Sequence, residues 1–296
     1  MFDSIPRSVN IAKTTFGVMK QDKELFLFPL LASFFSLMLL VIMVVPFIAA
    51  GFLDMMLTQM NMSSVGTIIF FVLLFILYFS TTAIATFFNV CVVYTAKKRF
   101  EGGDSKFFEA ISFAFSKIHL ILMWAAVSAT VGIILQLLDS GARQMKGIGR
   151  LVAQIIVSLI GFAWSIMTIF VVPSMVFNGT GPIAAIKESS QVISKTWGES
   201  LVRHYGLGLV QLIITIFFVL PFLILAIIAF ILGQPVIGAI LFVLFLGLLI
   251  LISVLFSAAN NVFNTALFWY ATKGQVPGYF EPDVMANAFR QKRGMF

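Results

Sequence analysis

The sequence predicts an all-α protein that crosses a membrane six times. Of its 296 residues, 60% are apolar and 10% are charged, and the mean hydropathy is +1.07. Soluble domains average about 45–50% apolar and about 25% charged residues, so this composition cannot cover an apolar core with polar surface. Six runs reach the roughly 20 apolar residues that a spanning helix needs. They cover residues 25–50, 65–96, 120–138, 151–172, 207–231 and 236–271.

Positive charge is distributed unequally between the two alternate sets of connections. Sixteen of the 19 lysine and arginine residues lie in the terminal segments and in the links after the second and fourth spans. The other links hold Arg143, Lys146 and Arg150. By the positive-inside rule, both termini are predicted to be cytoplasmic. The net charge of +7 therefore reflects topology and anionic lipid headgroups, and we expect no nucleic-acid partner.

Each cytoplasmic connection contains a segment whose apolar residues share one helical face, while basic residues lie elsewhere. Helices of this kind lie in the plane of the membrane interface. Three of them precede the first, third and fifth spans, and the fourth is a short C-terminal tail. Their apolar positions are Val9, Ala12, Phe16 and Met19; Phe107, Phe108, Ile111, Phe115 and Ile118; Ile183, Ile186, Val192 and Ile193; and Val284, Met285, Ala288 and Phe289.

The order of these segments predicts one integral membrane domain, residues 1–296, built from three successive units. Each unit is an interfacial amphipathic helix followed by a membrane hairpin, at residues 4–97, 104–177 and 182–273, and residues 282–296 form the tail. Sequential hairpins with short links pack as antiparallel neighbours. The units point in the same direction, unlike the inverted halves of many secondary transporters, which argues against an alternating-access carrier.

Two spans carry a stripe of amide and hydroxyl side chains. Positions 88–89 of the second span match positions 263–264 of the sixth, and Ala96 then falls on Ala271, which indicates an internal repeat. We favour hydrogen bonds between helices, each worth about 0.6 to 2 kcal/mol in membranes. The other interpretation is a cavity lining that suits uncharged polar groups or lipid headgroups. The stripe residues are Thr82, Thr86 and Asn89 in the second span and Ser257, Asn260, Asn261 and Asn264 in the sixth.

The sequence shows no motif for catalysis, a cofactor or a metal. The central part of every span lacks Asp, Glu, Lys, Arg and His, which proton relays and ion-coupled carriers place there. Asp22 and Glu24 stand at the start of the first span, where the helix macrodipole favours acids. The one cysteine, Cys91, excludes an internal disulfide and a cysteine-based metal cluster. We therefore expect no enzymatic activity, no cofactor and no metal site.

Several segments resemble an uncharacterised family of prokaryotic six-span membrane proteins. They are Lys20-Gln-Asp-Lys-Glu-Leu25, Ser128-Ala-Thr-Val-Gly132, Ser194-Lys-Thr-Trp-Gly-Glu-Ser200 and the stretch from Phe263-Asn264 to Tyr270-Ala271. The alternation of interfacial helices and hairpins is also loosely similar to the membrane domain attached to some glycerophosphodiester phosphodiesterases, without their catalytic barrel. The resemblance implies a fold and a location in the prokaryotic plasma (inner) membrane, and it supplies no catalytic residues.

These observations lead to two main hypotheses about function. In the first, the protein is a non-catalytic membrane module that organises lipids, a protein partner or a second copy of itself at the cytoplasmic face. Its headgroup contacts would be Lys98, Arg99, Lys187 and Lys195. In the second, it is a passive pore or carrier for a neutral or amphipathic solute, lined by the two stripes. A membrane enzyme acting on lipid headgroups through His119, His204 and Glu199 is the third and least favoured interpretation.

Overall fold

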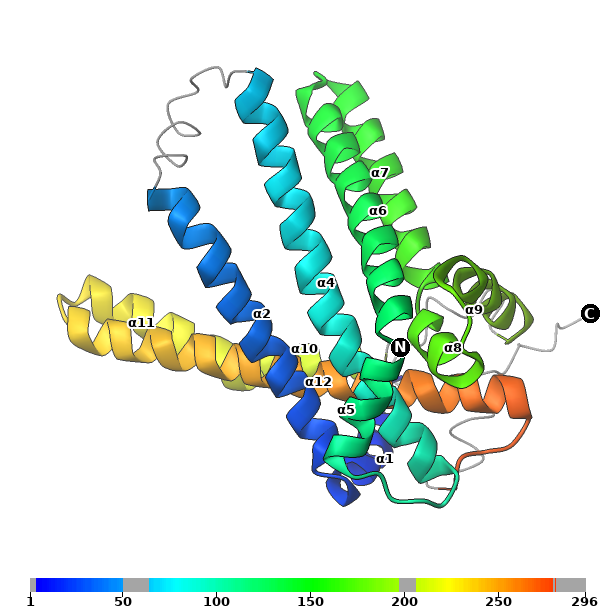
Figure 1. Cartoon of the computed structure of the whole chain (residues 1–296). Helices are drawn as coiled ribbons and strands as arrows, with labels where there is room; N and C mark the ends of the chain where they lie inside the picture. The colour runs from blue at the N-terminus through cyan, green and yellow to red at the C-terminus, as the bar shows by residue number, and fades with distance from the viewer. Residues whose placement is uncertain (1–3, 50–63, 197–205, 279, 281–296) are drawn as a thin grey trace, which may run out of the picture. The chain divides into compact units, whose positions relative to one another are not determined.

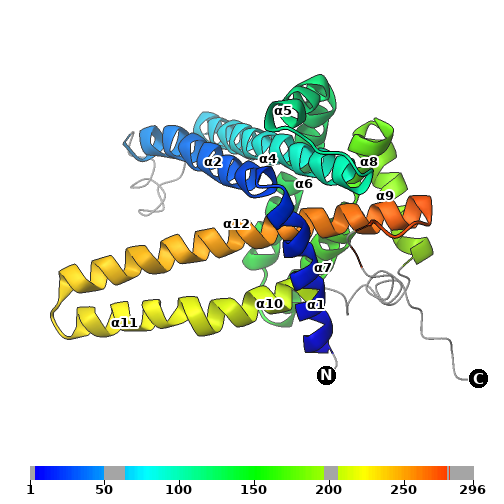
Figure 2. The same ribbon diagram turned by 90° about the horizontal axis from the view of Figure 1, so that it is seen from below.

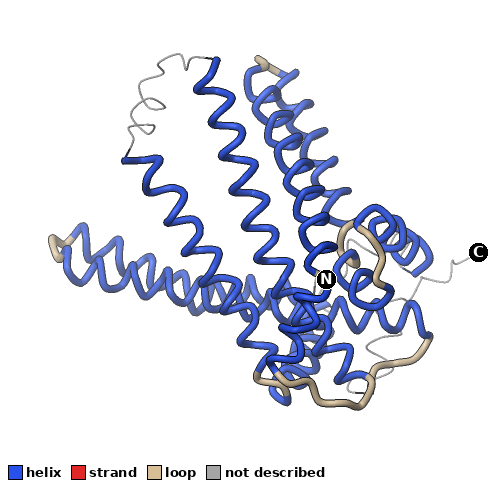
Figure 3. The backbone as a smooth tube through the Cα atoms, viewed as in Figure 1, coloured by secondary structure: helices blue, strands red, loops and turns tan. Residues whose placement is uncertain are grey.

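The structure is a computed structural model, which describes residues 4–49, 64–196, 206–278 and 280. Across these residues the regular structure is entirely helical (Figure 3). Six of the described helical segments are long and apolar enough to cross a membrane, namely Glu24–Pro46, Ile68–Phe100, Ile118–Gln144, Ile148–Asn178, Leu207–Ile231 and Pro235–Lys273. Each overlaps one predicted run, so the predicted class, an all-α polytopic membrane protein, is confirmed.

The chain forms two compact units, and each is described by itself. Unit 1 contains Met1–Leu30, Thr95–Lys106 and Val192–Phe296, and unit 2 contains Leu31–Tyr94 and Phe107–Gln191. The three successive units predicted from the sequence, which group helices by their order along the chain, stay a prediction. Unit 1 combines segments from both ends of the chain, and three of the four internal boundaries fall inside helices, in α2 (Glu24–Ala49), α4 (Ser64–Phe100) and α9 (Pro182–Thr196).

Unit 1 is built around the last two spans. It holds α1 (Ser4–Gln21), the start of α2 (Glu24–Ala49), the end of α4 (Ser64–Phe100) and the end of α9 (Pro182–Thr196). The fifth span consists of α10 (Gly206–Ile214), the π-helical turn η2 (Thr215–Val219) and α11 (Leu220–Ile231), and the sixth is α12 (Pro235–Lys273). Figure 2 shows α11 and α12 as an antiparallel hairpin, with α1 crossing α10 and α12.

Helix α1 is a packed element of unit 1. Its covered face consists of Ile11, Ala12, Thr15, Val18 and Met19, all less than 7% exposed, whereas Val9 of the predicted apolar face is 48% exposed. The face is wider than predicted because α1 packs against two helices, α10 and α12. The Phe16 ring meets the Phe256 ring of α12 edge to face, with 5.4 Å between centroids. The buried Thr15 hydroxyl donates to the Ile11 carbonyl at 2.7 Å, which satisfies it locally.

The fifth span contains a π-helical turn for a local reason. Pro221 has no backbone N–H, and in a regular α-helix its ring would clash with the carbonyl four residues earlier, at Phe217. The wider turn η2, which ends two residues before Pro221, accommodates the ring. The span therefore continues to Ile231 without a broken link.

Unit 2 contains the first four spans and the short helices between them. Beside parts of α2, α4 and α9, it holds α5 (Phe107–Ser116), α6 (Ile118–Gln144), α7 (Ile148–Met167) and α8 (Val171–Asn178). Helices α6 and α7 form a hairpin (Figure 1). A buried cluster of Leu120, Trp124, Val171, Met175 and Ala185 joins α6, α8 and α9, and the Trp124 and Trp164 rings stack at 6.0 Å.

The fourth span breaks between α7 and α8 at residues 168–170, and a side chain compensates the break. Pro173 lies in the first turn of α8, where a proline is tolerated. The backbone N–H of Phe170, which the break leaves outside both helices, donates to the Ser189 hydroxyl of α9 at 3.1 Å. Because no water reaches the bilayer core, such a partner is needed wherever a membrane helix is interrupted.

We expect Gly238→Ala to destabilise the α11–α12 hairpin. A Cβ at Gly238 would lie 2.9 Å from the Phe230 ring, closer than side chains tolerate. Overpacking of this kind costs about 1–3 kcal/mol, and thermal unfolding in nanodiscs would measure it. Gly247→Ala is the matched control on the same helix, since no atom lies within 4 Å of its Cβ position. An equal melting temperature for both variants would contradict this account of the hairpin.

Candidate functional site

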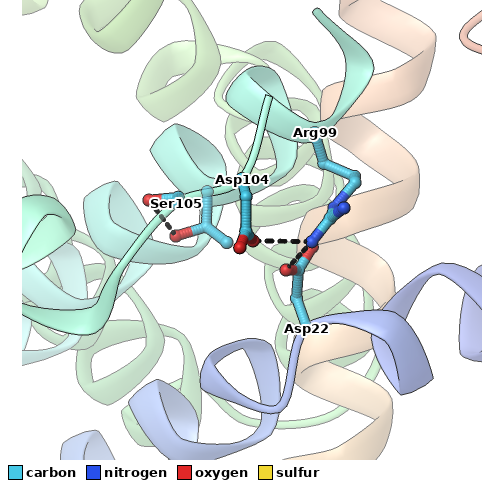
Figure 4. Close-up of polar contacts among 5 residues, drawn as sticks. Asp22, Arg99, Asp104 and Ser105 are labelled. Atoms are coloured by element: carbon cyan, nitrogen blue, oxygen red, sulfur yellow. Dashed lines mark hydrogen bonds and ion pairs between the residues drawn. The ribbon is translucent and has the colours of Figure 1, made fainter. Parts of the chain in front are cut away.

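The most elaborate polar site in the described residues is centred on Arg99 in unit 1 (Figure 4). The Arg99 guanidinium donates through Nε to Asp22 Oδ2 at 2.6 Å and through Nη2 to Asp22 Oδ1. Nη2 also donates to Asp104 Oδ1 at 2.8 Å. This two-point contact with Asp22 uses the planar fork of arginine, which a lysine could not reproduce. One guanidinium thus holds two carboxylates.

Three helix ends bring these side chains together. Asp22 lies in the two-residue break between α1 and α2, and Arg99 lies in the last turn of α4. The loop that follows α4 turns back at Gly102, whose φ of +81° favours glycine. Gly103 N–H then bonds the Lys98 carbonyl at 3.0 Å, which brings Asp104 back toward Arg99. The site therefore depends on how two helix junctions meet.

The two carboxylates on Arg99 differ greatly in exposure. The Asp22 side chain is 2% exposed, that of Arg99 is 17% exposed and that of Asp104 is 78% exposed. Removing either partner of a buried pair leaves an uncompensated buried charge, whereas an exposed pair contributes little. Asp22 is thus the structural partner of Arg99, and Asp104 is a solvated one. The sequence suggested only a macrodipole role for Asp22, since its partner is 77 residues away.

The predicted headgroup residues fall in different surroundings. Arg99 is engaged by both carboxylates. Lys98 is half-buried in the same turn, where its side chain passes so close to Gly103 that a Cβ there would lie 3.1 Å from Lys98 Cγ. Lys187 is exposed on α9 in unit 2. Lys195 lies in the last turn of α9, and its side chain is outside the described residues.

Helix α5 leaves part of its apolar stripe exposed. It runs antiparallel beside residues 87–94 of α4, with the Tyr94 hydroxyl donating to Glu109 at 2.6 Å and the Phe87 and Phe115 rings in contact at 4.9 Å. Ala110 and Ala114 are fully buried, whereas Phe108 is 81% and Phe115 60% exposed. The small alanines let α5 approach α4 closely. The Phe113 ring stacks on the Tyr94 ring at 4.3 Å, while Phe108 and Phe115 remain largely exposed.

The structure also brings together a polar cluster that sequence analysis missed. The Glu188 carboxylate of α9 accepts hydrogen bonds from the Ser174 hydroxyl and the Asn178 amide of α8. Ser174 is fully buried, and its hydroxyl also lies 2.8 Å from that of Thr180. These bonds close the α8–α9 corner beside the Phe170–Ser189 contact. The cluster is a structural clamp, because each of its members already has a partner.

The two predicted stripes belong to different units. Thr82, Thr86 and Asn89 lie on the part of α4 in unit 2, and the sixth-span stripe lies on α12 in unit 1. Ser257 is exposed and Asn260, Asn261 and Asn264 are half-buried, so this stripe follows the least covered side of α12. In the described part of the chain, the Asn260 and Asn264 side chains form no hydrogen bond.

An apolar cleft of about 180 Å³ lies between α2 and α4 in unit 2. It is lined by Met43, Val44, Phe70, Leu73, Leu74 and Leu77. Closer to the basic end of α4, the Phe35 and Phe88 rings stack at 5.9 Å and join the two helices. An apolar lining of this kind offers nothing to a polar solute.

Of the residues considered for a metal or an enzyme, His119 is the one within the described part of the chain. His119 is exposed at the start of α6, and His204 and Glu199 lie outside the described residues. Among the residues that the structure describes, no group of three His, Cys, Asp or Glu side chains could hold a metal ion. Cys91 is buried on α4, with its sulfur 3.6 Å from the Ala110 carbonyl.

Comparison with known sequences identifies one family. The family described as "Family of unknown function (DUF6159)" matches residues 67–278, a range that runs from the second span to just beyond the sixth. A search of curated proteins finds no match to the chain. The looser similarity to the membrane domain of glycerophosphodiester phosphodiesterases receives no support from either comparison.

We expect Asp22→Asn to destabilise the protein strongly, because it removes the charge that Arg99 pairs with in the interior. The expected loss is about 3 kcal/mol of unfolding free energy, measured by thermal or denaturant unfolding in nanodiscs. Asp139→Asn is the control, since it breaks an exposed pair with Arg143 one helical turn away and should cost no more than about 0.5 kcal/mol. Similar losses for both variants would show that burial of Asp22 contributes nothing.

Proposed function

The chain belongs to the DUF6159 family of unknown function, and from this premise we propose that it is a non-catalytic integral membrane protein that binds anionic lipids. Binding takes place at the basic face, which we assign to the cytoplasmic side of a prokaryotic plasma membrane with both termini there. Its role is to organise lipids, and the proteins that associate with them, at that face. The basic connections supply the charge, and α5 supplies the apolar contact.

The orientation of α5 carries this proposal. Burying a phenylalanine side chain is worth about 1.5–3 kcal/mol, yet Phe108 and Phe115 face outward while alanines face α4. Because α5 runs beside the last turns of a membrane span, its exposed rings are close to the level where the hydrocarbon ends. Aromatic rings at that level insert between lipids. On a helix that faces water, the phenylalanines would be buried and the alanines would be exposed.

The distribution of charge supports the same assignment. Lys106 precedes α5 and is exposed, Lys117 follows it, and Lys187 is exposed on α9. A lysine near an anionic membrane surface contributes about 1 kcal/mol of attraction. The link between α6 and α7 carries the smaller positive set, which leaves the basic connections on the opposite side of the membrane.

We expect Lys98→Gln with Lys187→Gln to reduce the number of anionic lipids that remain bound after extraction into detergent, as counted by native mass spectrometry. Two lost charges lower the attraction by about 2 kcal/mol in total, and retention of zwitterionic lipids should not change. In a second variant, Phe108→Ser with Phe115→Ser should reduce retention of both lipid classes, because it removes apolar rather than charged contact.

The matched control for charge is Lys146→Gln with Arg150→Gln, which removes the same number of charges from the α6–α7 link and the first turn of α7. It should leave retention of anionic lipids close to that of the parent protein. If the parent retains anionic and zwitterionic lipids in proportion to their supply, lipid organisation by the basic face is wrong.

One observation favours the second hypothesis, a passive path for a neutral or amphipathic solute. The amides of Asn260 and Asn264 lie on the least covered side of α12 and form no hydrogen bond in the described residues. A polar solute can form hydrogen bonds with such amides, which hydrocarbon cannot. The apolar cleft between α2 and α4 counts against a polar path through unit 2.

If the stripe lines a path, replacing Asn260, Asn261 and Asn264 with leucine should abolish solute flux in proteoliposomes, because the polar lining is lost. Thr130→Leu with Ser158→Leu is the control, since these residues are exposed polar positions on the third and fourth spans. A parent protein that gives no flux above empty liposomes, or a triple variant that conducts like the parent, would exclude a pore.

A further inference from the structure

We propose that Asp104 occupies, on the Arg99 guanidinium, the position of a lipid phosphate, and that an anionic headgroup exchanges with it. This inference rests on the proposed function and identifies one binding site within the basic face. Asp104 is thus an internal competitor that lowers the affinity of the site for anionic lipid.

Depth comes first. Arg99 is the residue before the end of the span Ile68–Phe100. This helix has 33 residues and is about 50 Å long, whereas the hydrocarbon core is about 30 Å thick, so its last turn extends beyond the hydrocarbon to the headgroups. Arginine side chains at such helix ends reach the phosphates. Lys97 and Lys98 precede Arg99 in the same turn. The guanidinium therefore lies at the level of the ligand that we propose for it.

A headgroup cannot replace the two carboxylates on Arg99 equally easily. Asp22 is buried and contacts Arg99 at two points. If Asp22 moved away, its negative charge would be left buried without this partner. Asp104 makes one contact at 2.8 Å and is 78% exposed, so water can solvate it as soon as it leaves. Exchange therefore takes place on the Asp104 side, while Asp22 keeps the guanidinium in position.

A phosphodiester matches what Asp104 supplies. Both groups carry one negative charge and present acceptor oxygens to an N–H fork, which arginine binds in carboxylates and phosphates alike. The exchange leaves the charge in contact with Arg99 unchanged and forms or breaks no covalent bond. A headgroup gains in addition the attraction of Lys97 and Lys98 of the same turn, and its lipid chains remain in the bilayer.

The loop explains why Asp104 is an effective competitor. The Ser105 side chain is buried and its hydroxyl lies 3.4 Å from that of Thr95, one turn before Arg99 on α4 (Figure 4). Together with the turn at Gly102 and Gly103, this contact keeps residue 104 close to Arg99. A tethered carboxylate competes at a high effective concentration, so only a dense anionic surface displaces it.

The test compares Asp104→Asn with Glu101→Gln. Both variants remove one negative charge from the same loop, but Glu101 lies 3.8 Å from Lys273 and does not contact Arg99. Binding of short-chain phosphatidylglycerol and phosphatidylcholine to the full chain is measured in detergent. We expect Asp104→Asn to bind phosphatidylglycerol about fivefold more tightly than the parent, the factor for one charge at a headgroup. Glu101→Gln should bind it less than about twofold more tightly.

Every outcome of this comparison is informative. A parent that prefers phosphatidylglycerol, with equal gains in both variants, would overturn exchange on Arg99 and keep the proposed function. A parent and variants without any preference for phosphatidylglycerol would overturn the proposed function as well. Inorganic phosphate that competes as strongly as the lipid would replace the headgroup with a soluble anion. Asp104 is exposed, so its substitution leaves the fold intact and the measurement interpretable.

Discussion

The lack of water in the hydrocarbon core determines where this chain can interrupt its helices and where it can place charge. A polar group left without a partner there costs several kcal/mol. The break in the fourth span is accordingly closed by the Ser189 hydroxyl, and Pro221 is accommodated by a π-helical turn that keeps the backbone bonded. The charged side chains of the six spans lie near their ends, and the most buried of the observed pairs, Asp22 with Arg99, lies at two helix junctions.

The same constraint separates structural polar groups from those available for binding. At the α8–α9 corner, hydrogen bonds join Glu188 to Ser174 and Asn178. These bonds are structural and do not indicate a ligand. Arg99 differs because one of its two carboxylates is buried and the other is solvated. Helix α5 also differs, because Phe108 and Phe115 are exposed while its alanines face α4. These two features support the proposal that lipid is the ligand. Within the described residues, neither involves an ionisable group at mid-span or an assembled metal site.

Hydropathy identified the six spans because the length and apolar character of a spanning helix are local properties of the sequence. Local patterns were less informative about which face of a helix is covered. Val9 was expected on the apolar face of α1 and is exposed, because α10 and α12 together cover a face centred on Ile11 and Thr15. Pairing between distant residues, such as Asp22 with Arg99, leaves no trace in one sequence. The same holds for the packing that joins segments from both ends of the chain in unit 1.

The position of α1 has a consequence for biosynthesis. Helix α1 ends at Gln21, whereas α10, the first of its two packing partners to be made, begins at Gly206, so about 185 residues separate them. At a synthesis rate of about 5–20 residues per second, α1 leaves the ribosome roughly 10–40 s before that partner exists. During this interval the apolar face that includes Val18 and Met19 has to rest on the membrane surface, as an amphipathic helix does. The nascent chain therefore needs the bilayer as a temporary partner before the last hairpin takes its place.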